Sequence, residues 1–181
     1  MLLRAFLFYI MISNHLKSTE YHPYYKSYID KAADADIVKG LLNNLKSVTK
    51  FLSEIPEEKH DYAYEPGKWS IKEVMLHIID TERIFAYRAL RIARGDTTPL
   101  AGFEQNDYVK NANTSNRSLA SLIDEYKTVR NATISLFSAL DESALEFLGE
   151  ASGAPISARA LGYIITGHEN HHLQVLKERY L

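Results

Sequence analysis

The spacing of apolar residues constrains this chain more than any other feature of its sequence. From residue 36 onward, leucine, isoleucine and valine recur at intervals of three and four, as in a helix that buries one face. Four stretches of about 20 residues show this spacing, whereas no stretch shows the strict alternation of a strand. They are residues 37–55, 71–94, 119–140 and 158–179. We therefore predict an all-α protein built as a four-helix bundle.

Capping residues mark the ends of these helices. Asp36 and Ser157 are suitable N-caps, and Ser70 forms a capping box with Glu73, three residues later. Gly95 provides the C-terminal stop of the second helix. The sequence thus predicts where each long helix begins.

The connection between the second and third helices, residues 95–117, is far longer than a tight antiparallel hairpin needs. A link of this length can cross the end of the bundle and leave these two helices parallel. We therefore predict an up-down-down-up topology, in which helices two and four are antiparallel. A further short helix is predicted after Asp141.

The length and composition restrict the domain organisation and the class of protein. A chain of 181 residues can bury one core and is too short for two ordinary domains. We place a bundle domain at residues 36–181 and a partly irregular extension at residues 1–35. The formal net charge of −2 argues against a nucleic-acid binder, which usually carries a basic excess. The absence of cysteine excludes disulfides, a thiolate metal site and a cysteine nucleophile.

The first residues, MLLRAFLFYIMI, resemble the start of a signal peptide. The stretch is too short for a membrane span, which needs about 20 apolar residues, and no small-x-small cleavage pattern follows it. We interpret it as an irregular or mis-started N-terminus, with Met11 as an alternative start. A weak export signal is the competing interpretation. The expected location is the cytoplasm, with no membrane partner.

Two histidines stand out in the last helix. At about 100° per residue, His168 and His172 fall near the centre of the apolar stripe and stack on one face, while His171 lies nearer its edge. Two imidazoles in a buried stripe are costly unless each has a partner. They are either hydrogen-bonded core residues or ligands of one metal ion, and their spacing favours the metal.

A third ligand is available in His77, on the flank of the apolar face of the second helix. If the second and fourth helices are antiparallel, His77 lies at nearly the same height as the other two histidines. The alternative is a boundary residue that is hydrogen-bonded to Glu73 or Asp80. The sequence therefore predicts a metal site formed by His77, His168 and His172.

Glu169 lies beside both histidines of the last helix. Three roles are open to it: it could support the ligands from behind, act as a base toward a bound water molecule, or be an ordinary, partly solvated glutamate. Residues 168–172 also fit the H-E-x-x-H signature of zinc proteases. The short stretch that follows holds neither the later ligands nor the rest of such a domain, so a peptidase is disfavoured.

Other charged and aromatic residues have two interpretations each. Glu82 falls on the apolar face of the second helix and needs a buried cation, for which Arg159 or Arg179 is the candidate. The outer side of the same helix carries Arg83, Tyr87, Arg91 and Arg94. A solvated face is favoured there over a site for a substrate carboxylate. The tyrosines expected to cover the bundle or a dimer interface are Tyr21, Tyr24, Tyr25 and Tyr28.

Over roughly residues 36–181, the chain resembles the DinB/YfiT-like family of metal-dependent four-helix proteins. The resemblance is carried by GKWSIKEV at residues 67–74, DTER at 80–83 and GHENHH at 167–172. It implies an up-down-down-up bundle and a divalent metal ion, zinc or nickel. The ligands implied are His77, His168 and His172.

The family also implies a function. Its characterised members are mostly transferases or isomerases that use a low-molecular-weight thiol, and others are described as hydrolases. Three histidine ligands leave a metal position open, which is typical of a catalytic site. We expect a metal-dependent transferase that activates such a thiol for attack on an electrophilic small molecule, in a chain that forms a homodimer. The alternatives are a hydrolase that uses a metal-bound hydroxide, and a non-catalytic bundle or small-ligand binding module.

Overall fold

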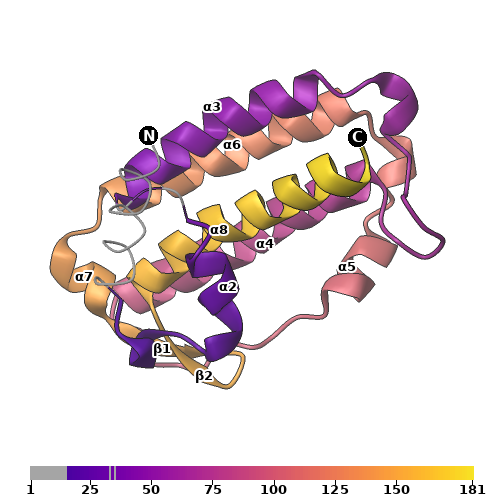
Figure 1. Ribbon diagram of the computed structural model, residues 1–181. Helices are drawn as coiled ribbons and strands as arrows, with labels where there is room; N and C mark the ends of the chain where they lie inside the picture. The colour runs from indigo at the N-terminus through magenta and orange to yellow at the C-terminus, as the bar shows by residue number, and fades with distance from the viewer. Residues whose placement is uncertain (1–15, 33, 35) are drawn as a thin grey trace.

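Four long helices form the body of the protein in the computed structural model, which describes residues 16–32, 34 and 36–181. They lie side by side in Figure 1 as α3 (Ile37–Ser53), α4 (Ile71–Ala93), α6 (Leu119–Ser138) and α8 (Ala158–Arg179). The side chains of Asp36, Ser70 and Ser157 each accept a hydrogen bond from a backbone N–H of the first turn, as predicted. The predicted four-helix bundle is confirmed.

The order of directions is also the predicted one. In Figure 1, α3 and α8 run one way along the bundle, and α4 and α6 run the other way. Helices α3 and α4 are joined by a loop with a short 3-10 turn, η3 (Glu57–Lys59). The topology is therefore up-down-down-up, and α4 is antiparallel to α8.

The crossover between α4 and α6 runs back along the bundle and makes these two helices parallel (Figure 1). It is not irregular throughout, because it contains α5 (Gln105–Asn111) and a 3-10 turn, η4 (Thr114–Asn116). Glu104 begins α5 by accepting a hydrogen bond from the backbone N–H of Asn106. This path carries α5 along the side of α4.

A small hairpin was not predicted from the sequence. After α7 (Glu142–Glu146), strands β1 (Leu148–Ala151) and β2 (Ala154–Ser157) pair antiparallel, and Leu100 of the crossover bridges to Ala151. The strands are too short for a visible alternation, and Pro155 lies within the second. Their two-residue turn, Ser152–Gly153, has φ of 55° and 75°, the type I′ geometry that suits a hairpin.

The residues that precede the bundle pack against its last helix. They form η1 (Ser18–Glu20), η2 (Pro23–Tyr25) and α2 (Lys26–Ile29). Glu20 is buried, and its carboxylate accepts hydrogen bonds from Arg159 at 2.6 Å and Ser157 at 2.9 Å, at the start of α8. These contacts fix residues 16–32 against the bundle. The predictions about a signal peptide and about Met11 lie outside the described residues.

The hydrophobic core is divided into two clusters by a polar layer. One cluster surrounds Leu41 and Phe85, and the other surrounds Val48 and Met75. Between them, each long helix contributes buried polar side chains: Asn44 from α3, His77 and Glu82 from α4, Arg130 from α6, His168 and Glu169 from α8. Because buried polar groups need partners, this layer is where the fold departs from a purely apolar bundle.

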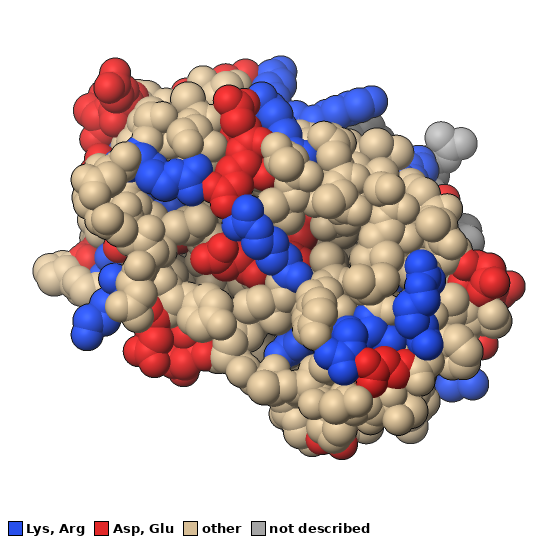
Figure 2. Space-filling model, turned by 180° about the vertical axis from the view of Figure 1, so that it is seen from behind, with Lys and Arg blue, Asp and Glu red and all other residues tan. Residues whose placement is uncertain are grey.

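The surface carries charges of both signs. On the face that Figure 2 shows, basic and acidic side chains are interspersed. None of the helices in the described part of the chain combines the length and apolar character that crossing a bilayer requires.

Candidate metal centre

Three histidines from two helices meet within the polar layer. The Nε2 atom of His168 lies 3.0 Å from Nε2 of His77 and 3.0 Å from Nε2 of His172. Their nitrogens all lie within 4.8 Å of one another, and the group contains no other His, Asp or Glu among the residues that the structure describes. The three residues that the sequence singled out therefore come together.

The fold explains why they meet. His168 and His172 are one turn apart on α8 and so stack on one face. The long crossover makes α4 antiparallel to α8, which brings His77 to their height. The sequence placed His77 on the flank of its helix, but its side chain is buried at 4% exposure. It is not bonded to Glu73 or Asp80, which accept hydrogen bonds from Ser70 and Arg83 instead.

Burial keeps the three imidazoles neutral. It lowers the pKa of His77 to about 4 and that of His172 to about 3. It also lowers the pKa of His168 well below its ordinary value, and the two neighbouring imidazoles act in the same direction. A neutral imidazole has one nitrogen with a free lone pair, which is the form that binds a metal ion.

The geometry of the three nitrogens fits one small cation. Nitrogens that are each about 2 Å from a tetrahedral zinc ion lie roughly 3.3 Å apart, close to the two contacts of 3.0 Å. Without a cation, Nε2 of His168 faces two other ring nitrogens, and one ring proton cannot satisfy both contacts well. The donor set therefore suits a divalent ion with an open position.

Thr81 contacts the ring of His77 on the side away from the other two histidines. It lies one turn further along α4, and its Oγ1 is 3.4 Å from Nδ1 of His77. A proton on Nδ1 that bonds to this hydroxyl leaves the lone pair on Nε2, toward the other two histidines. Sequence reasoning did not identify Thr81, although its position four residues after His77 was a usable signal.

Two cavities reach the three histidines. One, of about 240 Å³, has His77 and His168 in its wall, together with Tyr24, Tyr25, Tyr28, Thr81, Phe85, Phe103, Glu104, Gln105 and Ser152. The other, of about 440 Å³, reaches His172 and is lined by Trp69, Lys68 and Arg179 among others. The consecutive residues Gln105 and Asn106 of α5 line one cavity each. A small molecule thus has access to the histidines.

The tyrosines before the bundle form part of the first cavity. Tyr24, Tyr25 and Tyr28 line it, and the ring of Tyr28 meets that of His168 edge-on with centroids 5.3 Å apart. Tyr21 instead packs on the hydrophobic core. Three of the four tyrosines therefore line the cavity beside the histidines, a position that the sequence analysis, which expected them to cover the bundle or a dimer interface, did not specify.

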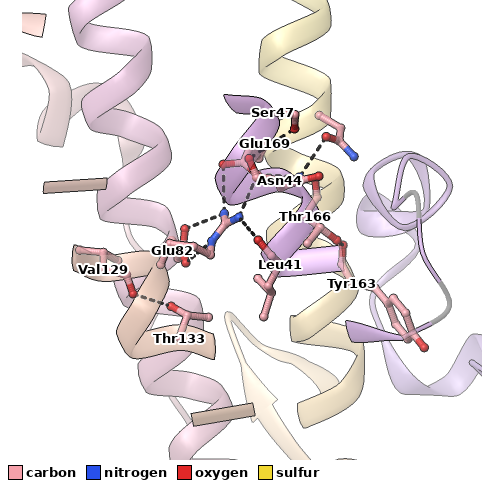
Figure 3. Close-up of polar contacts among 11 residues, drawn as sticks. Leu41, Asn44, Ser47, Glu82, Val129, Thr133, Tyr163, Thr166 and Glu169 are labelled. Atoms are coloured by element: carbon pink, nitrogen blue, oxygen red, sulfur yellow. Dashed lines mark hydrogen bonds and ion pairs between the residues drawn. The ribbon is translucent and has the colours of Figure 1, made fainter. Parts of the chain in front are cut away.

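Glu169 belongs to a separate buried cluster behind the histidines. The guanidinium of Arg130 donates hydrogen bonds to Glu82, to Glu169 and to the carbonyl of Leu41, three residues that Figure 3 labels around it. Arg130 donates to Glu82 at 2.8 Å and to Glu169 at 3.0 Å, and Asn44 donates to Glu169 at 2.6 Å. Glu169 is fully buried rather than partly solvated. Burial raises its pKa, although Arg130 acts against this.

The cluster corrects the partner expected for Glu82, which is Arg130 and neither Arg159 nor Arg179. Arg159 pairs with Glu20 and Glu146, and Arg179 contacts the hydroxyl of Tyr64. The sequence analysis did not consider Arg130, although it lies four residues after Tyr126 and three before Thr133, on the apolar face of the third helix. Buried ion pairs between helices that are distant in sequence require the fold to be known first.

The outer arginines of α4 do not gather around a common site. Arg83 pairs with Asp80 and Glu125, whereas Arg91 contacts Asp96 and Tyr87. Arg94 is exposed at the end of the helix. These residues form a solvated face with local ion pairs, which is the interpretation favoured from the sequence.

Comparisons with known proteins agree with this fold. The chain is 26% identical over 143 residues to a protein of Oceanobacillus iheyensis named as an inferred metal-dependent hydrolase, covering 75% of this chain and 81% of that protein. Its structure is similar to that of YfiT from Bacillus subtilis, described as an inferred metal-dependent hydrolase with an unusual four-helix bundle topology. The TM-score is 0.63 at 15% identity, covering 88% of this chain and 93% of YfiT.

A second solved structure with the same fold is YjoA, a DinB-like protein of Bacillus subtilis. Its TM-score is 0.56 at 22% identity, and the match covers 78% of this chain and 86% of that one. The model of the DinB superfamily matches residues 41–176, which include α4 and α6, most of α3 and α8, and the three histidines. The chain therefore belongs to the DinB superfamily.

Proposed function

We propose that His77, His168 and His172 bind one divalent metal ion and that the protein is a metal-dependent enzyme acting on a small molecule. The observation that carries this proposal is the convergence of three neutral imidazoles, two buried and one half-buried, on one point beside a cavity. A divalent ion held there would act as a Lewis acid and lower the pKa of a thiol or water beside it. Zinc and nickel are the candidate ions.

The finer proposal is a transferase that activates a low-molecular-weight thiol for attack on an electrophile. Glu169, the nearest carboxylate in sequence, is committed to Arg130 and Asn44, so it is poorly placed to take a proton from water. A thiol has an ordinary pKa of about 8.5 and gives up its proton far more easily than water does. This difference supports a thiol as the nucleophile.

Hydrolysis is the second candidate, because two of the proteins similar to this chain are named as inferred metal-dependent hydrolases. The residues around the cavity would serve either reaction. Burial raises the pKa of Tyr28, so its hydroxyl stays protonated at neutral pH and can donate a hydrogen bond to a substrate. The hydroxyl of Thr81 can accept a hydrogen bond from Nδ1 of His77.

Elemental analysis of protein purified without an affinity tag tests the metal site. We expect about one divalent ion per chain, and its loss in His77→Ala. His171→Ala is the matched control, because His171 lies on the same helix beside His172 but outside the group of three. Metal content well below one per chain in the natural protein would favour a non-catalytic bundle or small-ligand binding module.

The choice between the two reactions needs activity measurements. The metal-loaded protein is offered several small thiols with a model electrophile, and separately a panel of esters and amides. Conjugation that disappears in His172→Ala while the fold persists supports the transferase. Hydrolysis without conjugation would reverse the choice. The absence of a nucleic-acid partner, the homodimer and the cytoplasmic location stay predictions.

A further inference from the structure

Arg88 is a buried cation without an acidic partner among the residues that the structure describes. Its side chain, at 2% exposure, is among the most buried in the protein. Its Nη2 donates to the carbonyl of Ala101 at 2.7 Å and to Oγ of Ser152 at 3.0 Å, and both acceptors are neutral. Arg130, the other fully buried arginine, has two carboxylates. Because a buried guanidinium is costly without a counter-charge, Arg88 calls for an anion.

The residues around this guanidinium line the cavity that reaches the histidines. The Cζ atom of Arg88 lies 5.5 Å from the ring centre of Phe85 and 5.9 Å from that of Phe103. Both rings and Ser152 are part of the cavity wall. The ring of Phe85 is in turn 6.5 Å from that of His168, so at most about 12 Å separates the guanidinium from the His168 ring. One small molecule can reach both ends.

Two hydroxyls connect Arg88 with the cavity. Because Ser152 Oγ accepts a hydrogen bond from Arg88, its own proton is available for donation to a ligand. The Tyr25 hydroxyl lies near the same guanidinium, and burial raises its pKa although Arg88 acts against this, so it remains a donor. Donors that are polarised by a cation favour an anionic acceptor.

Ser152 is also an unusual choice for its backbone position. It has φ of 55° in a type I′ turn, where glycine, asparagine or aspartate is preferred. A serine in this conformation is less favourable than glycine. The hydroxyl at the cavity wall is a reason for keeping it.

We infer that the Ser152 end of this cavity, supported by Arg88, binds a carboxylate or similar anionic group of the small molecule whose reacting end lies at the histidines. This inference rests on the proposed function and names its substrate class. The one acidic residue in the cavity wall, Glu104, is exposed and accepts hydrogen bonds from Asn106 at the start of α5. Its charge opposes the anion and so provides a test of the opposite sign.

The probe is a series of mercaptocarboxylates, from mercaptoacetate to mercaptohexanoate, each compared with its uncharged amide. Binding to the Co²⁺-loaded protein is followed by the absorption band that a cobalt-bound thiolate produces. At the best chain length, we expect the carboxylate to bind about tenfold more tightly than its amide. This ratio of affinities is the size expected for one charge-assisted hydrogen bond. Glu104→Gln should increase this ratio.

Ser152→Gly is the decisive variant, because glycine suits the positive φ of the turn and the substitution removes the hydroxyl together with its β-carbon. It should reduce the ratio toward one by weakening the carboxylates more than the amides, and Arg88→Gln should act in the same way. Arg94→Gln, which removes an exposed charge of the same helix, is the matched control. An unchanged ratio in Ser152→Gly would overturn the inference. So would loss of the ratio in Lys68→Gln or Arg179→Gln, since these residues line the other cavity.

Failure of the proposed function gives a different result. If neither the mercaptocarboxylates nor their amides produce the cobalt–thiolate band in the natural protein, the proposal that the metal binds a thiol is wrong. The anion site is then tested with butyrate and benzoate, by their effect on the melting temperature. Stabilisation by these carboxylates that Ser152→Gly abolishes would still support the anion site, and no stabilisation would reject it.

Discussion

The carbonyl oxygen of Tyr28 faces Gly167 so closely that a β-carbon on residue 167 would lie 1.8 Å from it. This contact joins α2 to α8 directly before His168, whose ring meets that of Tyr28. Any side chain at residue 167 must push α2 away, because the clash is with the backbone. The wall of the cavity that Tyr24, Tyr25 and Tyr28 provide therefore depends on this glycine.

Gly167→Ala should destabilise the protein although alanine is the better helix former. Overpacking of this kind costs about 1–3 kcal/mol, more than the gain of about 1 kcal/mol in helix propensity. Chemical denaturation measures the difference. Gly40→Ala is the matched control, because a β-carbon there would meet its neighbours at 3.5 Å or more and should be neutral or stabilising. Equal stability of the two variants would show that α2 does not need this close approach.

Arg130 should be the most costly single side chain to remove. In Arg130→Met, Glu82 and Glu169 would face one another in the core without a cation, and loss of one partner from a buried ion pair costs about 3–5 kcal/mol. The free energy of unfolding from urea titration tests this. Adding Glu82→Gln and Glu169→Gln to the same protein should restore part of the loss, because the uncompensated charges are removed.

Arg83→Met provides the control for this measurement. Arg83 also pairs with two carboxylates, those of Asp80 and Glu125, but its side chain is 47% exposed. Exposed pairs contribute about 0–1 kcal/mol. A loss in Arg83→Met as large as that in Arg130→Met would contradict the idea that burial determines the cost.

The sequence was sufficient to predict the four-helix bundle, because the signals that define a helix lie within the helix itself. Helical spacing and the caps at Asp36, Ser70 and Ser157 predicted the long helices closely, and the length of the crossover predicted the topology. The hairpin was missed because strands of four residues carry too little alternation. The close contact of Gly167 with Tyr28 was also out of reach, since a helical glycine has several possible roles.

The three histidines could be grouped because helix geometry relates His168 to His172 and the topology relates both to His77. The partners around them could not. The pairing of Glu82 with Arg130 connects residues 48 positions apart, and Arg88 differs from its neighbours Arg91 and Arg94 only in the direction it faces. Such contacts depend on how each helix is rotated about its axis. A single sequence shows which face of a helix is buried, but not which neighbouring side chain each residue meets.

The metal-free protein should lose stability as the pH falls below 6.5. Because burial lowers the pKa of His77 to about 4 and of His172 to about 3, the unfolded chain binds protons at a higher pH than the folded one. For His77 alone this is on the order of 3 kcal/mol, present above pH 6.5 and lost by pH 4. Melting temperatures between pH 7 and pH 4.5 measure it.

His77→Gln should flatten this pH dependence, because one of the neutral imidazoles is removed. Carboxylates with a lowered pKa, such as that of Glu20, lose their contribution at lower pH, whereas burial raises the pKa of Glu169 and Asp80, which stabilise the fold as the pH falls. The difference between the natural protein and His77→Gln therefore isolates the contribution of His77. A melting temperature that stays constant from pH 7 to pH 4.5 in the natural protein would mean that the imidazoles are more accessible to water than their burial indicates.

Thr81→Val should weaken metal binding without weakening the fold. Valine fills the same volume but cannot accept the hydrogen bond from Nδ1 of His77, so the ring loses the partner that fixes its orientation. Loss of such an outer contact typically reduces metal affinity about 10–100-fold. Competition with a chelating dye measures the affinity, and Thr81→Ser should restore it because the hydroxyl returns.

Thr133→Val is the control, since Thr133 is a buried threonine whose hydroxyl bonds to the carbonyl of Val129 in α6. Equal affinities in Thr81→Val and Thr133→Val would show that the protein holds His77 in place by packing against Trp69, whose ring centre is 4.9 Å away, and not by this hydroxyl.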